Sequence, residues 1–221
     1  YNPAAAQGNA GKILAEVENQ LSLRKFKYDL QLTDKPGHAL ELARQAAESG
    51  YDLVIAAGGD GTINEVINGL MLAKLNGHSC PAMAVLPVGR GNDFAFGMNI
   101  PHVLEDACDL LLLGTKRTID IGFVRGGDYP EGRYFGNGIG LGFDAVVGFE
   151  AAKIKWLHGA ASYLVAVVRT IFKYAHAPVY EINIDGNVSS QAYLMVSIMN
   201  GRRMGGSFMM APSGDPGDAT F

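Results

Sequence analysis

The most constraining feature of this sequence is an apolar run that ends in a glycine-rich turn and continues into a helical pattern. The run LVIAA occupies residues 53–57, and GGDGT follows directly at residues 58–62. A continuous apolar run of this length is typical of a strand buried on both faces of a parallel sheet. The glycines let the turn expose backbone N–H groups, and a helix that begins at Thr62 aims the positive end of its dipole at them. This combination predicts a phosphate-binding site.

Asp60, in the middle of the turn, narrows the choice of phosphate compound. A carboxylate repels a bare phosphate, but a divalent cation between the two groups removes the repulsion. The turn therefore favours a nucleotide that carries Mg²⁺ over a simple anion. The alternative is an ordinary strand–turn–helix unit in which Asp60 only stabilises the turn.

The first half of the chain alternates between helical and strand patterns. Helical periodicity covers residues 11–23, 40–49, 64–74 and 103–113, and strand patterns cover residues 26–32, 53–57 and 82–87. This alternation predicts an α/β fold with a doubly wound parallel sheet. Ligands of such sheets bind beyond the carboxyl ends of the strands, where the glycine-rich turns at 58–61 and 89–91 are expected.

The pattern changes after Gly114, and strands predominate. We predict strands at residues 118–124, 133–139, 179–184 and 190–199, a turn at Gly186-Asn187 that makes a hairpin of the last two, and a helical stretch at 143–175. With 221 residues, of which 48% are hydrophobic, the chain has enough apolar sequence for one large or two small domains, and the change of pattern favours two. We therefore predict a nucleotide-binding α/β domain at residues 1–114 and a mainly β, sandwich-like domain at residues 115–221.

Charge and cysteine content exclude several classes of protein. The formal net charge is −4 and the sequence has no basic run, which argues against a nucleic-acid partner. Cys80 and Cys108 lack the spacing of a zinc site or a disulfide framework, so a reducing, cytoplasmic location is expected. No apolar stretch reaches the roughly 18 residues that span a bilayer. The stretch with Lys153, Lys155 and Trp156 fits either a helix that docks on anionic lipid or a solvated helix face.

Further motifs accompany the turn in a fixed order. They are Asn2-Pro3, EVINGL at 65–70, PVGRGNDFA at 87–95, IDIG at 119–122, FGNGIGLGFDA at 135–145, and NG, GG and AP at 200–212. GGDGT alone is shared by lipid kinases, NAD kinases and, as GGDGS, phosphofructokinases. Taken together, the motifs resemble the diacylglycerol-kinase-like lipid kinases, with their patterns GGDGTxxEVxNGL and PxGTxNDFA.

The resemblance implies an ATP-dependent kinase of lipid hydroxyls, with the NAD-kinase- and phosphofructokinase-like arrangement of an α/β domain and a β-sandwich. It implies ATP contacts from Asn2, Pro3, Ala4, Ala5, Ala6, Thr33, Gly59, Asp60, Gly61, Thr62, Ile63, Asn64 and Glu65. It also implies that Asp60, Asp93 and Asp120 form one acidic catalytic network around Mg²⁺. For Asp93 and Asp120, helix capping and turn formation are the alternatives.

The chain departs from the family pattern at two places. Arg90 replaces the usual threonine of GTxND, and we expect its guanidinium to pair with ATP phosphates instead. Asp215, Asp218 and Thr220 match the family's acidic turn, which holds a structural Mg²⁺, but DA replaces its DG. The family's general-base glutamate corresponds to a position beyond residue 221, so the sequence names no proton acceptor.

These observations predict a lipid kinase that transfers the γ-phosphoryl group of ATP to a diacylglycerol-like or related lipid alcohol, with Mg²⁺ as cofactor. An NAD-kinase-like enzyme and a non-catalytic nucleotide- or lipid-binding regulatory protein are the alternatives. The expected partner is the lipid alcohol, with no nucleic acid. Peripheral contact with the inner face of the membrane and a homodimer are left open.

Overall fold

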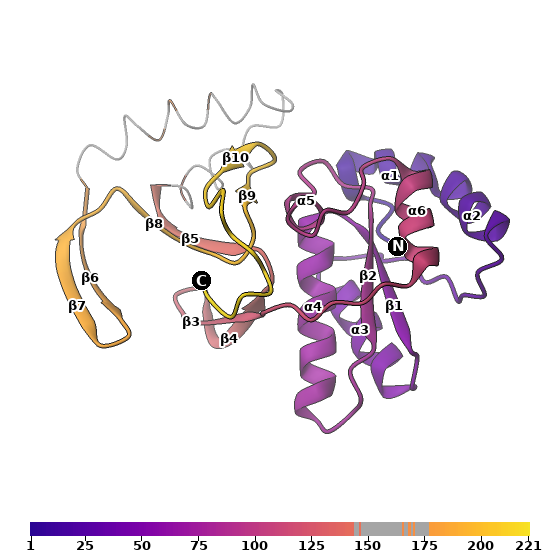
Figure 1. The fold of residues 1–221 in the computed structure, drawn as a ribbon, viewed down its shortest axis with the longest axis horizontal. Coiled ribbons are helices and arrows are strands. Elements are labelled where there is room, and N and C mark those ends of the chain that lie inside the picture. Colours follow the sequence, from indigo (N-terminus) through magenta and orange to yellow (C-terminus); the bar gives the residue numbers. More distant parts are fainter. Residues whose placement is uncertain (144–145, 147–164, 166–167, 169, 171–176) are drawn as a thin grey trace. The chain divides into compact units, whose positions relative to one another are not determined.

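The computed structural model describes residues 1–143, 146, 165, 168, 170 and 177–221 (Figure 1). The chain forms two compact units, residues 1–138 with 199–221 and residues 139–198. The first unit holds all the described helices from α1 to α6 and the parallel strands, so the predicted mixed α/β class is confirmed. The predicted boundary between residues 114 and 115 stays a prediction.

The first unit opens with a 3-10 turn, η1 (Ala5–Gly8), followed by three helices, a parallel strand–helix–strand unit, two further helices and short antiparallel strands. Its helices are α1 (Asn9–Lys12), α2 (Leu14–Leu23), α3 (His38–Glu48), α4 (Asp60–Leu75), α5 (Asp93–Gly97) and α6 (Leu104–Leu113). Its strands are β1 (Leu53–Gly58), β2 (Ala82–Pro87), β3 (Gly122–Gly126), β4 (Tyr129–Phe135), β9 (Arg203–Met204) and β10 (Phe208–Met209). The helices predicted around residues 11–23, 40–49, 64–74 and 103–113 are confirmed, although the first is broken at Ile13 and the third begins earlier, at Asp60.

Strands β1 and β2 are parallel and in register, from Leu53 opposite Ala82 to Gly58 opposite Pro87. Successive residues of each strand point to opposite faces, so Ala56 and Val85 join one hydrophobic cluster and Ala57 and Leu86 join another. Helices α3 and α4 cover the first face, and α2 and α6 cover the second (Figure 1). Only the carboxyl-terminal halves of the two strands are fully buried, so this end of the pair is rigidly packed.

The packing of α3 on α4 depends on small residues at the contact. Ala39, Ala43 and Ala47 of α3 are buried, and Gly69 of α4 lies against them. A Cβ atom added to Gly69 would stand 2.3 Å from the carbonyl oxygen of Leu40 and 3.0 Å from the Cβ of Ala43. The two backbones are therefore closer than any larger residue at position 69 permits.

We expect Gly69→Ala to destabilise the protein by about 1–3 kcal/mol, because the added methyl group meets rigid backbone and the helices must separate. The midpoint of thermal unfolding should then fall by roughly 2–4 °C for each kcal/mol of lost stability. Gly61→Ala is the matched control, since a Cβ at Gly61 meets nothing within 4 Å. Equal unfolding midpoints for Gly69→Ala and the parent would contradict this account of the helix contact.

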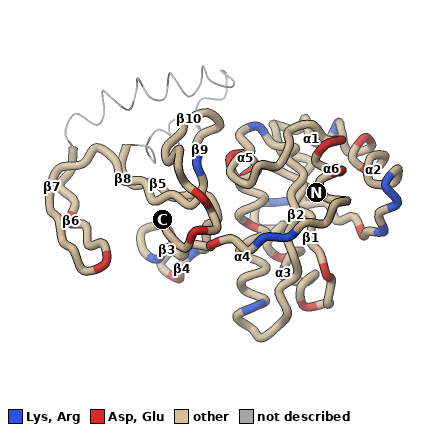
Figure 2. Tube along the Cα trace, viewed as in Figure 1, with Lys and Arg blue, Asp and Glu red and all other residues tan. Residues whose placement is uncertain are grey.

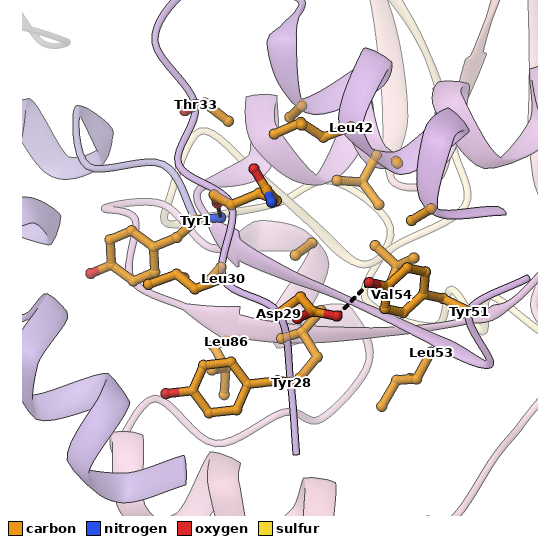
Figure 3. Close-up of a pocket in the computed structure, with 18 of the residues that line it drawn as sticks. Tyr1, Tyr28, Asp29, Leu30, Thr33, Leu42, Tyr51, Leu53, Val54 and Leu86 are labelled. Atoms are coloured by element: carbon orange, nitrogen blue, oxygen red, sulfur yellow. Dashed lines mark hydrogen bonds between the residues drawn. The ribbon is translucent and has the colours of Figure 1, made fainter. Parts of the chain in front are cut away.

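The strand predicted at residues 26–32 is not formed. This segment runs extended beside the N-terminus, where the Tyr1 amino group donates to the Gln31 carbonyl at 2.8 Å and the Thr33 amide donates to the Tyr1 carbonyl at 2.9 Å. A cavity of about 660 Å³ lies between the segment and β1, lined by Tyr28, Leu30 and Leu53 among others (Figure 3). The alternating sequence is compatible with a strand, but a strand also needs a hydrogen-bonded neighbour along its length.

The second unit contains β6 (Val179–Ile184) and β7 (Asn187–Ala192), which form an antiparallel hairpin with Ile184 opposite Asn187. The predicted hairpin is confirmed, but the single strand predicted at 190–199 is wrong, since the chain breaks into β7 and β8 (Met195–Met199). Likewise, the single strand predicted at 133–139 is divided between the end of β4 and the start of β5 (Gly138–Gly142). Strand β5 pairs with β8. Almost all of the predicted helical stretch, including Lys153, Lys155 and Trp156, lies outside the described residues.

Within the described ranges, no helix has both the length and the apolar composition needed to cross a membrane. Basic and acidic residues are interspersed along the tube of the first unit (Figure 2).

Candidate active site

The site is built on the turn that joins β1 to α4. Gly59 has an extended backbone, with φ −97° and ψ −172°, and α4 begins at Asp60. A Cβ on Gly58 would stand 2.5 Å from the Cβ of Thr62, so the strand enters the helix more closely than a larger residue would permit. Asp60 lies in the first turn of a helix of 16 residues, where the helix dipole stabilises negative charge.

A second turn, residues 89–91 after β2, packs directly on the first. A Cβ added to Gly89 would stand 2.3 Å from the Cα of Gly59, so the two backbones touch. Asn92 is buried and holds the turn, because its side-chain amide donates to the carbonyls of Pro87 at 3.2 Å and Gly89 at 3.1 Å. The two glycine-rich turns therefore form one surface beyond the carboxyl ends of β1 and β2.

A cavity of about 520 Å³ opens at this surface. It is lined by Asn2, Ala4, Ala5, Ala6, Gln7, Thr33, Asp34, Lys35, Pro36, Gly59, Asp60, Gly61, Thr62, Glu65, Gly89, Arg90 and Gly91. Most of the residues predicted to contact ATP, Arg90 included, are thus brought together from four separate segments of the chain. Their contacts with a nucleotide stay predictions.

Three residues predicted to contact ATP do not line this cavity. Ile63 is 1% exposed and packs in the core beneath α4. The side chain of Asn64 donates to the Tyr134 carbonyl at 2.9 Å and accepts from the Arg133 guanidinium at 2.8 Å. Pro3 accepts a hydrogen bond from the Gly11 amide and anchors the N-terminal turn.

The N-terminal segment reaches the site through Asn2. Its amide N–H donates to the Ala57 carbonyl at 2.9 Å, and its side-chain amide donates to the Thr62 hydroxyl at 2.9 Å. The chain then turns along the cavity wall with φ 51° at Ala6 and 59° at Gln7, a left-handed conformation that costs a residue other than glycine about 1 kcal/mol or more. Asn2 thereby ties residues 4–7 to the start of α4.

Glu65 organises the opposite wall. Its carboxylate oxygens accept hydrogen bonds from the amides of Gly37 at 2.9 Å and Ala39 at 3.1 Å, at the start of α3. This fixes the loop that carries Thr33. Asp34, Lys35 and Pro36 of the same loop also line the cavity, and sequence reasoning missed them, although they follow Thr33 directly.

Two carboxylates flank Gly91. A Cβ there would stand 3.0 Å from Oδ2 of Asp60 and 3.5 Å from Oδ2 of Asp93. Asp60 accepts a hydrogen bond from the Phe94 amide at 2.9 Å. Burial raises the pKa of Asp60 above its usual range. The hydrogen bond from the Phe94 amide lowers this pKa, and the negative charge of Asp93 raises it further.

The predicted network of Asp60, Asp93 and Asp120 around Mg²⁺ stays a prediction. Asp120 accepts a hydrogen bond from the Ala219 amide at 2.7 Å, which fastens the loop at 215–220. In that loop Asp215 accepts from the Gly217 amide and Asp218 accepts from Thr220, each within its own turn. Across the part of the chain that the structure describes, no three acidic, histidine or cysteine side chains form a group able to hold a metal ion.

We expect Asp60→Asn to stabilise the fold at neutral pH. A carboxyl group with a raised pKa binds its proton more tightly in the folded protein, so its contribution to stability falls as the pH rises above about 4, the ordinary value for Asp. An asparagine keeps an oxygen for the Phe94 amide but carries no charge. Unfolding midpoints measured between pH 3.5 and 7.5 should therefore show an advantage of Asp60→Asn that grows with pH. An advantage that is constant, or that shrinks as the pH rises, would contradict the raised pKa.

Comparison with known proteins identifies the family. The model of the diacylglycerol kinase catalytic domain matches residues 1–124, more than half of the chain. The chain belongs to this family of lipid kinases. The model of the YegS C-terminal NAD kinase beta sandwich-like domain matches residues 137–221, which confirms the predicted sandwich-like second part. The resemblance of the motifs to lipid kinases is also confirmed.

Individual relatives agree with this family. The chain is 33% identical over 225 residues to a diacylglycerol kinase of Bacillus subtilis, covering 100% of this chain and 70% of the relative. A diacylglycerol kinase of Staphylococcus saprophyticus is 33% identical over 166 residues, which cover 75% of this chain and 51% of the relative. Among solved structures, a diacylglycerol kinase from Bacillus anthracis superposes with a TM-score of 0.73 at 27% identity, over 98% of this chain and 68% of that one. The chain thus spans between about half and 70% of the curated relatives described here.

Proposed function

We propose that this chain transfers the γ-phosphoryl group of ATP, with Mg²⁺, to the hydroxyl group of a diacylglycerol-like lipid alcohol. The single observation that carries the proposal is the cavity of about 520 Å³ in front of the two touching glycine-rich turns, with Asp60 in its wall. Phosphoryl transfer needs positioning and charge stabilisation more than covalent chemistry, and this cavity is suited to both.

The cavity favours a nucleotide over a smaller anion. Its volume lies within the range of about 300–1,000 Å³ typical of small-molecule sites. The α4 helix starts at the cavity and directs the positive end of its dipole toward it, which favours phosphate groups. Lys35 and Arg90 add positive charge to the wall, and the fork of the Arg90 guanidinium can donate to two phosphate oxygens where the family's threonine donates once.

The residues at the cavity can accommodate Mg²⁺ that enters as a complex with the nucleotide. Mg²⁺ commonly uses only one or two protein carboxylates, together with phosphate oxygens and water, so a preformed group of three ligands is not required. Asp60 is the carboxylate suited to this role, because it borders the cavity while Asp93 is engaged by an arginine and an amide. When bound, the ion would neutralise the charge that develops on the phosphates. A structural ion held by Asp215, Asp218 and Thr220 stays a separate proposal.

The acceptor is inferred from the relatives. Both the Bacillus subtilis and the Staphylococcus saprophyticus proteins are named diacylglycerol kinases, which supports a diacylglycerol-like alcohol for this chain. Such a substrate resides in a membrane, so the proposal includes peripheral contact with a lipid surface during turnover.

The direct test is an assay with γ-labelled ATP and Mg²⁺ against mixed vesicles that contain diacylglycerol, against other lipid alcohols, and against NAD. We expect label in the diacylglycerol fraction, and we expect Asp60→Asn to reduce its rate at least about 10²-fold, as is typical when a group that stabilises transition-state charge is removed. Asp52→Asn, an exposed position before β1, is the matched control and should keep the parental rate. Label in NAD alone, or full activity of a folded Asp60→Asn variant, would overturn the proposal.

A further inference from the structure

Arg203 is not among the residues predicted to form the site, and it does not line the cavity at the two turns. It belongs to β9, and its side chain is only 13% exposed. Its Nε donates to Oδ1 of Asp93 at 2.8 Å, and its Nη2 donates to the carbonyl oxygen of Gly91 at 2.8 Å. The guanidinium carbon also lies 4.1 Å from the centroid of the Phe96 ring. One side chain therefore holds both the last residue of the 89–91 turn and the first residue of α5.

The backbone of Arg203 and the carboxylate of Asp93 are each held by a further hydrogen-bond partner. The carbonyl of Arg203 accepts a hydrogen bond from the side chain of Asn137 at 2.9 Å. The Gly206 amide, three residues further along, donates to both oxygens of Asp93, at 3.0 and 2.9 Å. The side chain of Asp93 is 8% exposed, so its charge depends on these partners for compensation.

We propose that Arg203 is a positioning residue for the nucleotide: it fixes the Gly91 carbonyl and the Asp93 carboxylate so that the 89–91 turn keeps its place against Asp60. This inference rests on the proposed function, since it assigns a role at that same cavity. Arg203 does not line the cavity, so it acts through the turn and not by touching the nucleotide.

Loss of the guanidinium has two consequences at the cavity. The Gly91 carbonyl loses the hydrogen bond that Arg203 donates to it, which frees the turn to move away from Gly59 and Asp60. Asp93 becomes a buried carboxylate without an ion-pair partner, close to the carboxylate of Asp60. Both changes act on the wall that would receive the phosphates, so binding of ATP should suffer more than binding of the lipid.

Arg202 supplies a matched control. Its Nη2 donates to the Phe96 carbonyl at 3.1 Å and to the side chain of Asn99 at 2.6 Å, and its guanidinium lies 5.2 Å from the same Phe96 ring. Arg202 thus resembles Arg203 in residue type, neighbourhood and ring contact, but its hydrogen bonds go to Phe96 and Asn99 and not to Gly91 or Asp93. A general loss of stability from removing an arginine here would affect both variants.

The test compares the parent with Arg203→Met, Arg203→Lys and Arg202→Met by calorimetric titration of ATP with Mg²⁺ and by steady-state kinetics on diacylglycerol vesicles. We expect Arg203→Met to raise the Kd and the KM for ATP about tenfold or more, as for loss of a charged hydrogen bond, with the KM for lipid changed less than about twofold. Arg203→Lys should recover part of this loss, because an ammonium group pairs with Asp93 but lacks the fork that also reaches Gly91. Arg202→Met should resemble the parent.

A folded Arg203→Met variant that binds ATP as tightly as the parent would overturn the inference. The inference would also fail if the KM for ATP and the KM for lipid rose equally in Arg203→Met and rose in the same way in Arg202→Met. If Arg203→Met does not fold, the Arg203→Lys variant provides the test. A KM for ATP in Arg203→Lys equal to that of the parent would then overturn the inference. A parent that neither binds ATP nor labels lipid would refute the proposed function itself, which separates the two failures.

Discussion

The contact between two glycine-rich turns is the constraint on which the rest of the site depends. Gly59 and Gly89 approach so closely that a single added Cβ would stand 2.3 Å from the facing Cα. This contact places the ends of β1 and β2 side by side and leaves a cavity in front of them, with the start of α4 at its base. Side chains elsewhere in the first unit, from the buried alanines of α3 to Leu86, hold the two strands that carry these turns.

Electrostatics set a second condition at the same place. Asp60 and Asp93 stand on either side of Gly91, and burial already disfavours the charge of Asp60. An ion pair of low exposure between Arg203 and Asp93 compensates one of these charges. Such pairs add little net stability because both charges lose water, but removal of one partner leaves the other uncompensated. Loss of Arg203 would therefore leave the carboxylate of Asp93 uncompensated beside Gly91.

The sequence predicted the parts of the structure that depend on local pattern. The run before Gly58, the turn and the following helix are recognisable because strand, turn and helix start are encoded within 18 consecutive residues, LVIAAGGDGTINEVINGL at 53–70. The extended segment at 26–32 was misjudged, since its alternation says nothing about whether a neighbouring strand is present to pair with it. The break between β7 and β8 was missed for a similar reason, because both halves have strand composition.

The sequence motif predicts where the candidate site lies in the chain, but it predicts less well which side chains line the cavity. Ile63 and Asn64 follow Thr62 in the motif, but each helical residue turns the side chain by about 100°, so Ile63 packs in the core and Asn64 reaches Tyr134. The sequence does not place Lys35 at the site, because the position of Lys35 depends on how its loop folds. It does not place Arg203 there either, because the partners of Arg203 lie 110 and 112 residues away in the sequence. Asp120 illustrates the same limit: its position in IDIG is local, whereas its bond to Ala219 depends on the tertiary structure.

We propose that nucleotide phosphates bind at the two touching glycine-rich turns and not in the larger cavity of about 660 Å³ beside β1. The most direct measurement is a backbone amide NMR titration of the ¹⁵N-labelled protein with ATP and Mg²⁺. The account predicts shifts of the amides at residues 59–62 and 89–91, with those at 28–31 and 53–55 unchanged. Shifts confined to residues 28–31 and 53–55 would contradict it.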